Sequence, residues 1–174
     1  MRSAGIPPEK AFAQFWNHPA VQAHMTGKID SRKFHAQAAR HLSSEIAYDD
    51  FAAAWCGIFR PMPGMAALFR AVAKRLPVTI LSDTDPLHWN HLSRRFPWLL
   101  LALRPTLSHE TGMLKPDPRV YRLAAANAGA APESCVFVDD MAANVAGARA
   151  AGMRAVHFTD AARLRAAFER LGVL

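Results

Sequence analysis

Residues 135–144 have the sequence CVFVDDMAAN, in which a short apolar run ends in two adjacent carboxylates, Asp139 and Asp140. An unbroken apolar run of this length is typical of a strand buried on both faces of a sheet. Residues 141–151 are rich in Ala and carry apolar side chains at helical spacing, and Gly152 is suited to end that helix. The stretch therefore predicts two carboxylates at the point where a buried strand ends and a helix begins.

This carboxylate pair is a candidate metal site. Ligands of open α/β sheets bind at the carboxyl ends of the strands, which is where Asp139 and Asp140 are expected to lie. Two neighbouring carboxylates repel each other and stay ionised most easily beside a cation, and oxygen-only ligands favour Mg²⁺. The alternative is that one Asp caps the helix and the other is a surface residue.

Bulk composition narrows the class of protein. A chain of 174 residues predicts one domain with room for a small subdomain, and the net charge is +7. Its 16 Arg and 5 Lys are dispersed without a run, so no nucleic-acid partner is expected. The start, MRSAGIPPEK, lacks the apolar region of a signal peptide, and the longest apolar stretch, 96–103, is too short to span a membrane. We expect a cytoplasmic protein with no membrane partner.

Cysteines and histidines give no metal pattern. Cys56 and Cys135 lack CxxC spacing and are expected to be inert thiols. His88 and His91 lie at i, i+3 on a predicted helix, but further zinc ligands are missing from the pattern. Surface or hydrogen-bonded histidines are expected elsewhere, which applies to His18, His24, His35 and His41.

Residues 7–59 predict three or four short amphipathic helices with no strand between them. Phe12, Phe15 and Trp16 are spaced for one helix face, and Asp30 is suited to begin a following helix. Phe51, Trp55 and Ile58 repeat at helical spacing farther along the chain. The sequence therefore predicts a helical subdomain over 1–60 and an α/β core over 61–174.

The core predicts alternating strands and helices, which is typical of a doubly wound parallel sheet. Asp85-Pro86, Asp117-Pro118 and Asp160 are suited to begin helices, with the Asp as N-cap. The expected strands are 78–81, 105–108, 135–138 and 155–158.

Three polar groups follow successive strands of this sheet. Ser82, Lys115 and the Asp139–Asp140 pair are separated by 33 and 24 residues, and the carboxyl ends of parallel strands lie side by side. A hydroxyl, an ammonium group and two carboxylates are the groups needed to bind a phosphoryl group beside Mg²⁺.

Three segments resemble a known family. LSDTDPLHWNHL, SHETGMLKPDPRVY and CVFVDDMAANVAGARAAGMRAVHF are similar to motifs II, III and IV of the haloacid dehalogenase-like (HAD) superfamily. The branch that the chain resembles most is the bacterial glucose-1-phosphate phosphatase-like group, which is similar to the phosphatase domain of soluble epoxide hydrolase. The segment HMTGKIDSRKF resembles that branch's cap, which is inserted after the first strand. The resemblance covers nearly the whole chain and implies a HAD-like Rossmannoid fold.

The resemblance also implies roles for residues. Ser82 and Lys115 would contact phosphate, Asp139 and Asp140 would serve Mg²⁺, and Asn144 would orient the metal site. The substrate implied is a small phosphorylated metabolite such as a sugar phosphate. Its phosphorus would be attacked by an Asp carboxylate to give an aspartyl-phosphate that water then hydrolyses.

The chain departs from the family pattern in two ways. Asp83 stands where the branch usually has Asn, and its extra negative charge would oppose phosphate unless it is capped or paired. The family also begins with a buried strand ending in Asp-x-Asp, and no Asp occurs before Asp30. Asp83-Thr84-Asp85 matches the Asp-x-Asp pattern, but it lies in the segment that resembles motif II. We therefore expect the first core strand and the nucleophile to be absent, through a shortened chain or a start codon assigned too late.

The sequence thus predicts a HAD-like hydrolase, a Mg²⁺-dependent phosphatase that lacks its nucleophile and is inactive as given. One alternative is a pseudo-enzyme that binds a phosphorylated ligand or a partner protein. Another is a 2-haloacid dehalogenase, although carbon–halogen displacement would not need the cation that Asp139 and Asp140 suggest. A bacterial receiver domain is rejected because its acidic pair comes early in the chain.

Overall fold

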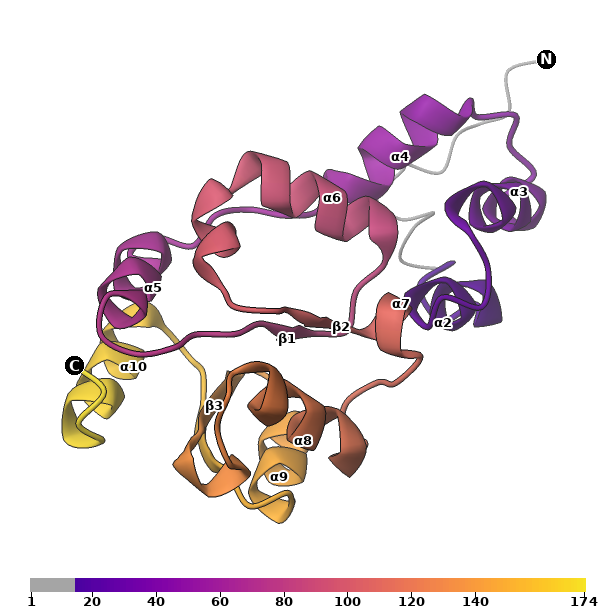
Figure 1. The fold of residues 1–174 in the computed structure, drawn as a ribbon. Coiled ribbons are helices and arrows are strands. Elements are labelled where there is room, and N and C mark those ends of the chain that lie inside the picture. The colour runs from indigo at the N-terminus through magenta and orange to yellow at the C-terminus, as the bar shows by residue number, and fades with distance from the viewer. Residues whose placement is uncertain (1–14) are drawn as a thin grey trace.

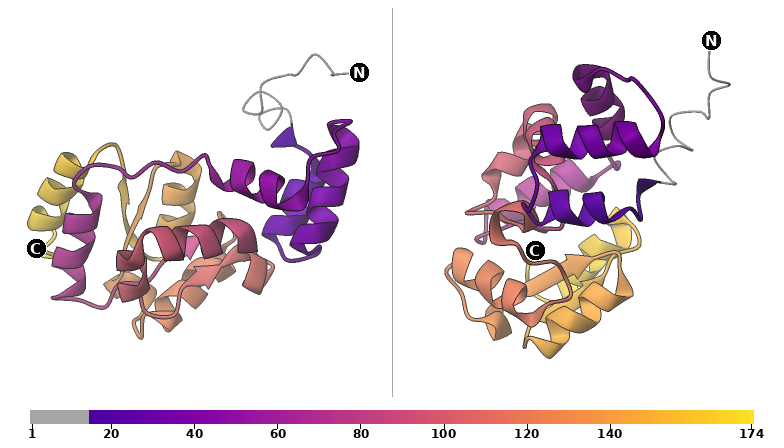
Figure 2. Two further views of the ribbon diagram at one scale, coloured as in Figure 1. Left: turned by 90° about the horizontal axis from the view of Figure 1, so that it is seen from above. Right: turned by 90° about the vertical axis from the view of Figure 1, so that its right-hand side faces the viewer.

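The computed structural model describes residues 15–174, so the expected contribution of Phe12 lies outside the described part. The described chain begins with three short helices, α2 (Pro19–Met25), α3 (Ser31–His41) and α4 (Tyr48–Cys56). These three helices, which we call the helical subdomain, stand at the end of the molecule opposite α5 and α10 (Figure 2). The domain division at residue 60 stays a prediction.

The helical subdomain packs around aromatic side chains. Phe15, Phe34, Phe51 and Trp55 are almost fully buried in one cluster, as the helical spacing predicts. The predicted N-cap is confirmed at α3, where the Lys33 backbone N–H donates to Asp30 Oδ1 at 2.7 Å.

Two predicted core positions are wrong. Trp16 is 45% exposed and Ile58 is 51% exposed. Trp16 lies in the turn that follows Phe15 and outside any helix, and Ile58 lies beyond the end of α4.

The rest of the chain alternates helices and strands, as predicted. Asp85, Asp117 and Asp160 each cap the helix that follows, because a backbone N–H of the first turn donates to the side chain. The elements are α5 (Met65–Ala73), β1 (Leu81–Ser82), α6 (Pro86–Arg95), η1 (Pro97–Leu101), β2 (Thr106–Leu107), α7 (Ser108–Thr111), α8 (Pro118–Asn127), η2 (Pro132–Ser134), β3 (Val136–Asp139), α9 (Ala142–Ala150), β4 (Arg154–His157) and α10 (Ala161–Arg170).

All pairing between the described strands is parallel. β1 pairs with β2, with Leu81 opposite Thr106, and β3 pairs with β4, with Asp139 opposite His157. The strand predicted over 78–81 is shorter and later than expected, although backbone hydrogen bonds of 2.7 Å from Leu103 N to Val78 O and from Thr106 N to Ile80 O extend its alignment.

The described strands form two separate two-stranded sheets, β1–β2 and β3–β4. The expected absence of a strand between the strand of Ser82 and the strand of Asp139 stays a prediction. The expectation that β3 is buried on both faces is wrong, because all four of its residues are only partly buried, whereas both residues of β2 are buried. Within the described strands, β1 and β3 each have one unpaired edge, so neither has the neighbours of a central strand.

Helices connect the two sheets. α8 and α9 contact each other, and they also contact strands of the two sheets (Figure 1). Tyr121 of α8 is fully buried and meets the Phe137 ring of β3 edge-on at 5.3 Å between centroids. Leu81 of β1 packs against the same cluster, so the two sheets share one apolar core.

The helix carrying residues 142–150 has the predicted inward face, with Val145 and Ala148 buried, and Gly152 follows it at φ +95°. Such a φ favours glycine, which confirms the predicted end of the helix. Within residues 15–174, every helix is too short or too polar to cross a membrane.

Candidate functional site

The site is centred on an ion pair between two predicted residues. Lys115 Nζ donates to Asp139 Oδ2 at 2.7 Å, and the two side chains are only 10% and 8% exposed. Lys115 lies in the loop after α7, and Asp139 ends β3. The structure therefore brings together two predicted residues that are 24 positions apart in the chain, as expected for groups that follow parallel strands.

The second oxygen of Asp139 is also occupied. Asp139 Oδ1 accepts the Met141 backbone N–H at 2.8 Å and the Asn144 side-chain amide at 3.0 Å. Burial alone would raise the pKa of Asp139, but the hydrogen bonds from Lys115, Met141 and Asn144 outweigh it and lower the pKa below its ordinary value. Asn144 thus touches the carboxylate that it was expected to orient.

Asn144 is itself held in place through its backbone. It is buried on α9, and its backbone carbonyl oxygen accepts a hydrogen bond from the Tyr121 hydroxyl at 2.9 Å. Burial raises the pKa of Tyr121 to about 12, with Asp139 and Asp83 adding to the rise, so this hydroxyl stays a donor. Tyr121 was not identified as a site residue from the sequence.

Asp83 lies on the other side of Lys115. Its Oδ1 accepts the Lys115 backbone N–H at 3.1 Å. Burial raises the pKa of Asp83, the Lys115 amide and ammonium oppose that rise, and Asp139 adds to it. Ser82 is partly buried at the end of β1, immediately before Asp83. The ends of β1 and β3 therefore converge on Lys115, and the negative charge of Asp83 is partly compensated.

Asp140 differs from Asp139 because it is exposed. Its backbone carbonyl oxygen lies 2.8 Å from His157 Nε2, and since a carbonyl only accepts, this ring nitrogen donates. His157 was not identified as a site residue from the sequence, although it lies within the strand expected over 155–158. In the structure His157 ends β4 opposite Asp139 in the parallel register.

Asp139 and Asp140 offer carboxylate oxygens, which are the kind of ligand that Mg²⁺ prefers. Two carboxylates alone are fewer ligands than a complete Mg²⁺ coordination shell contains. The part of the chain that the structure describes contains no group of three or more His, Cys, Asp or Glu that could hold a metal ion. Mg²⁺ keeps several waters and is commonly held by one or two protein carboxylates, which these two residues could supply.

Other reactive groups lie apart from this site. Cys56 and Cys135 are both free thiols, and burial raises the pKa of each, that of Cys56 to about 11. For His24 and His88, whose protonated form carries the charge, burial lowers the pKa. The expectation that histidines are exposed or fully hydrogen-bonded is wrong for His24, because its Nδ1 is buried without a hydrogen-bond partner among the described residues.

Solved structures resemble this chain in fold over most of its length. A HAD family enzyme from Bacteroides thetaiotaomicron, solved as a magnesium complex, has a TM-score of 0.77 at 22% identity, covering 88% of this chain and 84% of that one. A predicted HAD-like family hydrolase from Porphyromonas gingivalis has a TM-score of 0.79 at 20% identity, covering 94% and 89%. Likeness at these identities shows the fold.

Curated relatives match over shorter segments. A phosphatase from Mycobacterium tuberculosis is 52% identical over 48 residues, which are 28% of this chain and 22% of the relative. A phosphoserine phosphatase from Thermus thermophilus is 49% identical over 51 residues, 29% of this chain and 20% of the relative. The matched segments span about a fifth of the length of these relatives.

The sequence profile of the haloacid dehalogenase-like hydrolases matches residues 4–152, which is most of the chain. This match agrees with the parallel strands, with the Lys115–Asp139 pair at their ends, and with the solved structures of the same fold. The chain belongs to the haloacid dehalogenase-like hydrolase family.

Proposed function

We propose that this protein is a Mg²⁺-dependent phosphatase that acts on small phosphate monoesters of the sugar phosphate type. The observation that carries the proposal is the buried Lys115–Asp139 pair, with the exposed Asp140 beside it. The names of two curated relatives, both phosphatases, support the same chemistry over the segments that match.

In this proposal, Ser82 and Lys115 hold the phosphoryl group. The Ser82 hydroxyl donates to a phosphoryl oxygen, and the Lys115 ammonium offsets its charge. Asp139 and Asp140 would hold Mg²⁺, which supplies further charge neutralisation when it is bound. Asn144 keeps Asp139 in place through the hydrogen bond to Oδ1.

An attacking carboxylate is the missing part of this chemistry. Asp139 is engaged by Lys115, Asp83 faces the Lys115 amide, and Asp85 is fully buried. We propose that the nucleophile belongs to a strand lying between β1 and β3, where the two described sheets are separate. Its carboxylate oxygen would bond to phosphorus while the ester P–O bond breaks and the leaving oxygen takes a proton from the second Asp of the same Asp-x-Asp motif. Water would then cleave the aspartyl-phosphate, releasing phosphate and restoring the carboxylate.

The test compares this chain with a version extended by an apolar strand ending in Asp-x-Asp. The 174-residue chain should release no phosphate above background from an aryl phosphate or from sugar phosphates with Mg²⁺. The extended chain should show turnover, which is lost when the first Asp of the added motif is changed to Asn. The double change Asp139→Asn and Asp140→Asn should abolish turnover again.

Other outcomes favour other functions. Robust Mg²⁺-dependent release by the unextended chain would contradict the missing-nucleophile proposal and would make Asp83 or Asp85 the candidate nucleophile. An extended chain that binds phosphate without turnover would favour a binding protein without catalysis. Release of halide from a 2-haloacid without phosphatase activity would favour a dehalogenase.

A further inference from the structure

Asp85 is a fully buried acid that has no part in the proposed binding of phosphate or metal. Its side chain is 0% exposed, and both of its oxygens accept hydrogen bonds. Oδ2 accepts the Trp55 indole N–H at 3.0 Å, and Oδ1 accepts the His88 backbone N–H at 2.9 Å. A buried carboxylate is costly unless such bonds compensate for lost water, so these partners are required and not incidental.

His88 closes a ring of contacts between Asp85 and Trp55. Its Nδ1 lies 3.0 Å from Asp85 Oδ2, and its Nε2 lies 3.0 Å from the Trp55 backbone carbonyl oxygen. The imidazole also stacks on the Trp55 indole, with 5.1 Å between centroids and an angle of 6° between planes. α4 is thereby joined to the first turn of α6 by hydrogen bonding and ring stacking at once.

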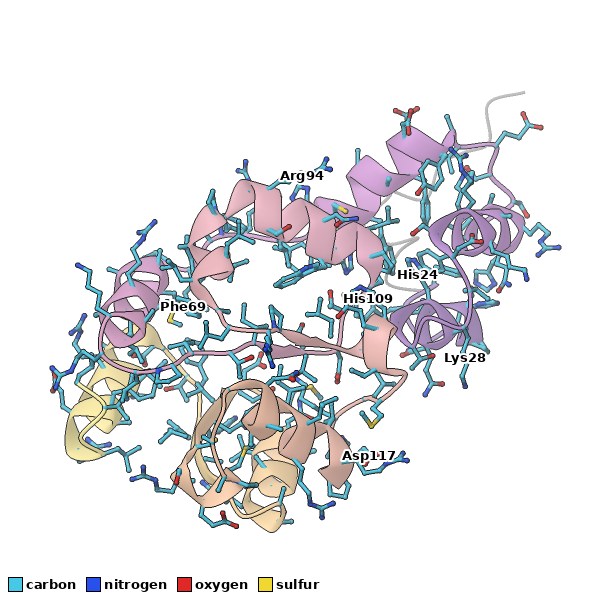
Figure 3. All side chains as sticks on the ribbon, viewed as in Figure 1. His24, Lys28, Phe69, Arg94, His109 and Asp117 are labelled. Atoms are coloured by element: carbon cyan, nitrogen blue, oxygen red, sulfur yellow. The ribbon has the colours of Figure 1, made fainter. Side chains whose placement is uncertain are left out.

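A second helix of the helical subdomain faces the same carboxylate. His24 of α2 is fully buried, and its Nδ1 lies 3.9 Å from Asp85 Oδ1, while its Nε2 lies 3.0 Å from Ser31 Oγ. Figure 3 shows His24 where α2 approaches the start of α6. Both α2 and α4 therefore present polar atoms to Asp85.

Asp85 ends the loop that begins at the proposed phosphate site. Ser82, the last residue of β1, and Asp83 precede it, and Asp83 Oδ1 accepts the Lys115 backbone N–H. Between the two acids, the Thr84 backbone N–H donates to the Ser108 hydroxyl at 2.8 Å. Consecutive residues of the loop are thus fixed to the proposed site, to α7 and to the helical subdomain, and the short backbone between them has little freedom to relax.

We propose that Asp85 is a positioning residue through which Trp55 and the helical subdomain hold the 82–85 loop in the conformation that phosphate binding requires. The functional part rests on the proposed function, because it takes Ser82 as a phosphate ligand. The structural part stands without it, because it concerns only which elements fix this loop.

The test uses Trp55→Phe and Asp85→Asn, with Asp160→Asn as the matched control. Asp160 is also a helix N-cap that accepts a backbone N–H three residues on, but it is partly exposed and lies at α10. The readouts are the amide resonances of Ser82 and Asp83 and the affinity for inorganic phosphate in the presence of Mg²⁺, measured on the 174-residue chain.

Trp55→Phe should move the Ser82 and Asp83 resonances and weaken phosphate binding about fivefold, the loss expected for one hydrogen bond. Asp160→Asn should change neither readout. In the Asp85→Asn background, Trp55→Phe should move the loop resonances less than in the unaltered chain, because the amide keeps only one oxygen to accept from either the Trp55 indole or the His88 backbone N–H. Lowered stability with unmoved loop resonances would overturn the proposal.

Hydrogen exchange of the unaltered chain gives a second test if the variants do not fold. The Thr84 amide should exchange in the same opening event as the amides of α4. Exchange of Thr84 while α4 stays protected would contradict the coupling. If the unaltered chain binds no phosphate, the proposed function fails, and the loop resonances and the exchange data still decide the positioning role.

Discussion

Lys115 and Asp139 neutralise each other's charge in a nearly buried site, where an unpaired charge would be costly. Both are nearly buried, so removing one partner leaves the other charge without compensation. We expect Lys115→Met to lower the free energy of unfolding by about 3 kcal/mol, measured by urea denaturation at pH 7. The control is Arg119→Met, which removes an exposed partner of Asp117 and should have little effect. A loss in Lys115→Met no larger than in this control would contradict the buried pair.

His24 should make stability depend on pH. Burial lowers the pKa of His24 below the ordinary value of 6.5, although Asp85 opposes this change. The unfolded chain then takes up a proton at this residue near pH 6.5, while the folded chain takes it up only at lower pH. Stability should therefore fall as the pH drops below about 6.5, and His24→Gln should flatten this slope. Urea denaturation at pH 5.5 and 7.5 measures the difference, and an unchanged slope would refute the assignment.

The sequence predicted the residues at the strand ends better than those around Asp85. Lys115 and Asp139 could be paired because each follows a strand of the predicted parallel sheet, and parallel strands end at a common edge. Asp85 was correctly predicted as a helix N-cap. Its contact with Trp55 could not be predicted, because the two residues are 30 positions apart and no periodic pattern specifies how the helical subdomain meets the core.

The starts of helices were predicted more accurately than the strands. An N-cap is a local contact between residues two or three positions apart, so Asp30, Asp85, Asp117 and Asp160 were all identified from neighbouring residues. The extent and burial of a strand depend instead on its neighbours in the sheet. For that reason β1 is shorter than expected and β3 is only partly buried.

Close packing of α9 against the Lys115 loop depends on Gly147. A Cβ at this position would lie 2.8 Å from Pro116 Cβ and 2.9 Å from the Tyr121 hydroxyl oxygen. Gly147→Ala should gain helix propensity but lose more through overpacking, with a net destabilisation of about 1–2 kcal/mol. Chemical denaturation measures this loss.

The control for Gly147 is on the same helix. Ala146→Gly changes an exposed residue and should cost only the propensity term, roughly 1 kcal/mol, without disturbing Lys115. The amide resonance of Lys115 should move in Gly147→Ala and not in Ala146→Gly. A stabilised Gly147→Ala variant would show that α9 and the loop have room to separate.

At the scale of the whole molecule, the two sheets are joined through side chains and helices and not through a continuous ladder of the described strands. A strand placed between β1 and β3 would pair both unpaired edges and cover the partly exposed apolar residues beside them. Four or five newly buried apolar side chains would contribute on the order of 10 kcal/mol, which is comparable with the whole stability of a domain.

The extended chain described above should therefore be far more stable than the 174-residue chain, and this gain should not depend on catalysis. We expect a higher denaturation midpoint and a larger dependence on denaturant, since more surface is buried. The same extension with Pro at the middle of the added strand cannot complete the ladder and should lose most of the gain. An extension whose first motif Asp is changed to Asn should keep the stability while losing turnover. If the Pro-bearing extension stabilises the chain equally well, the added residues do not pair between β1 and β3, and the proposed location of the nucleophile is wrong.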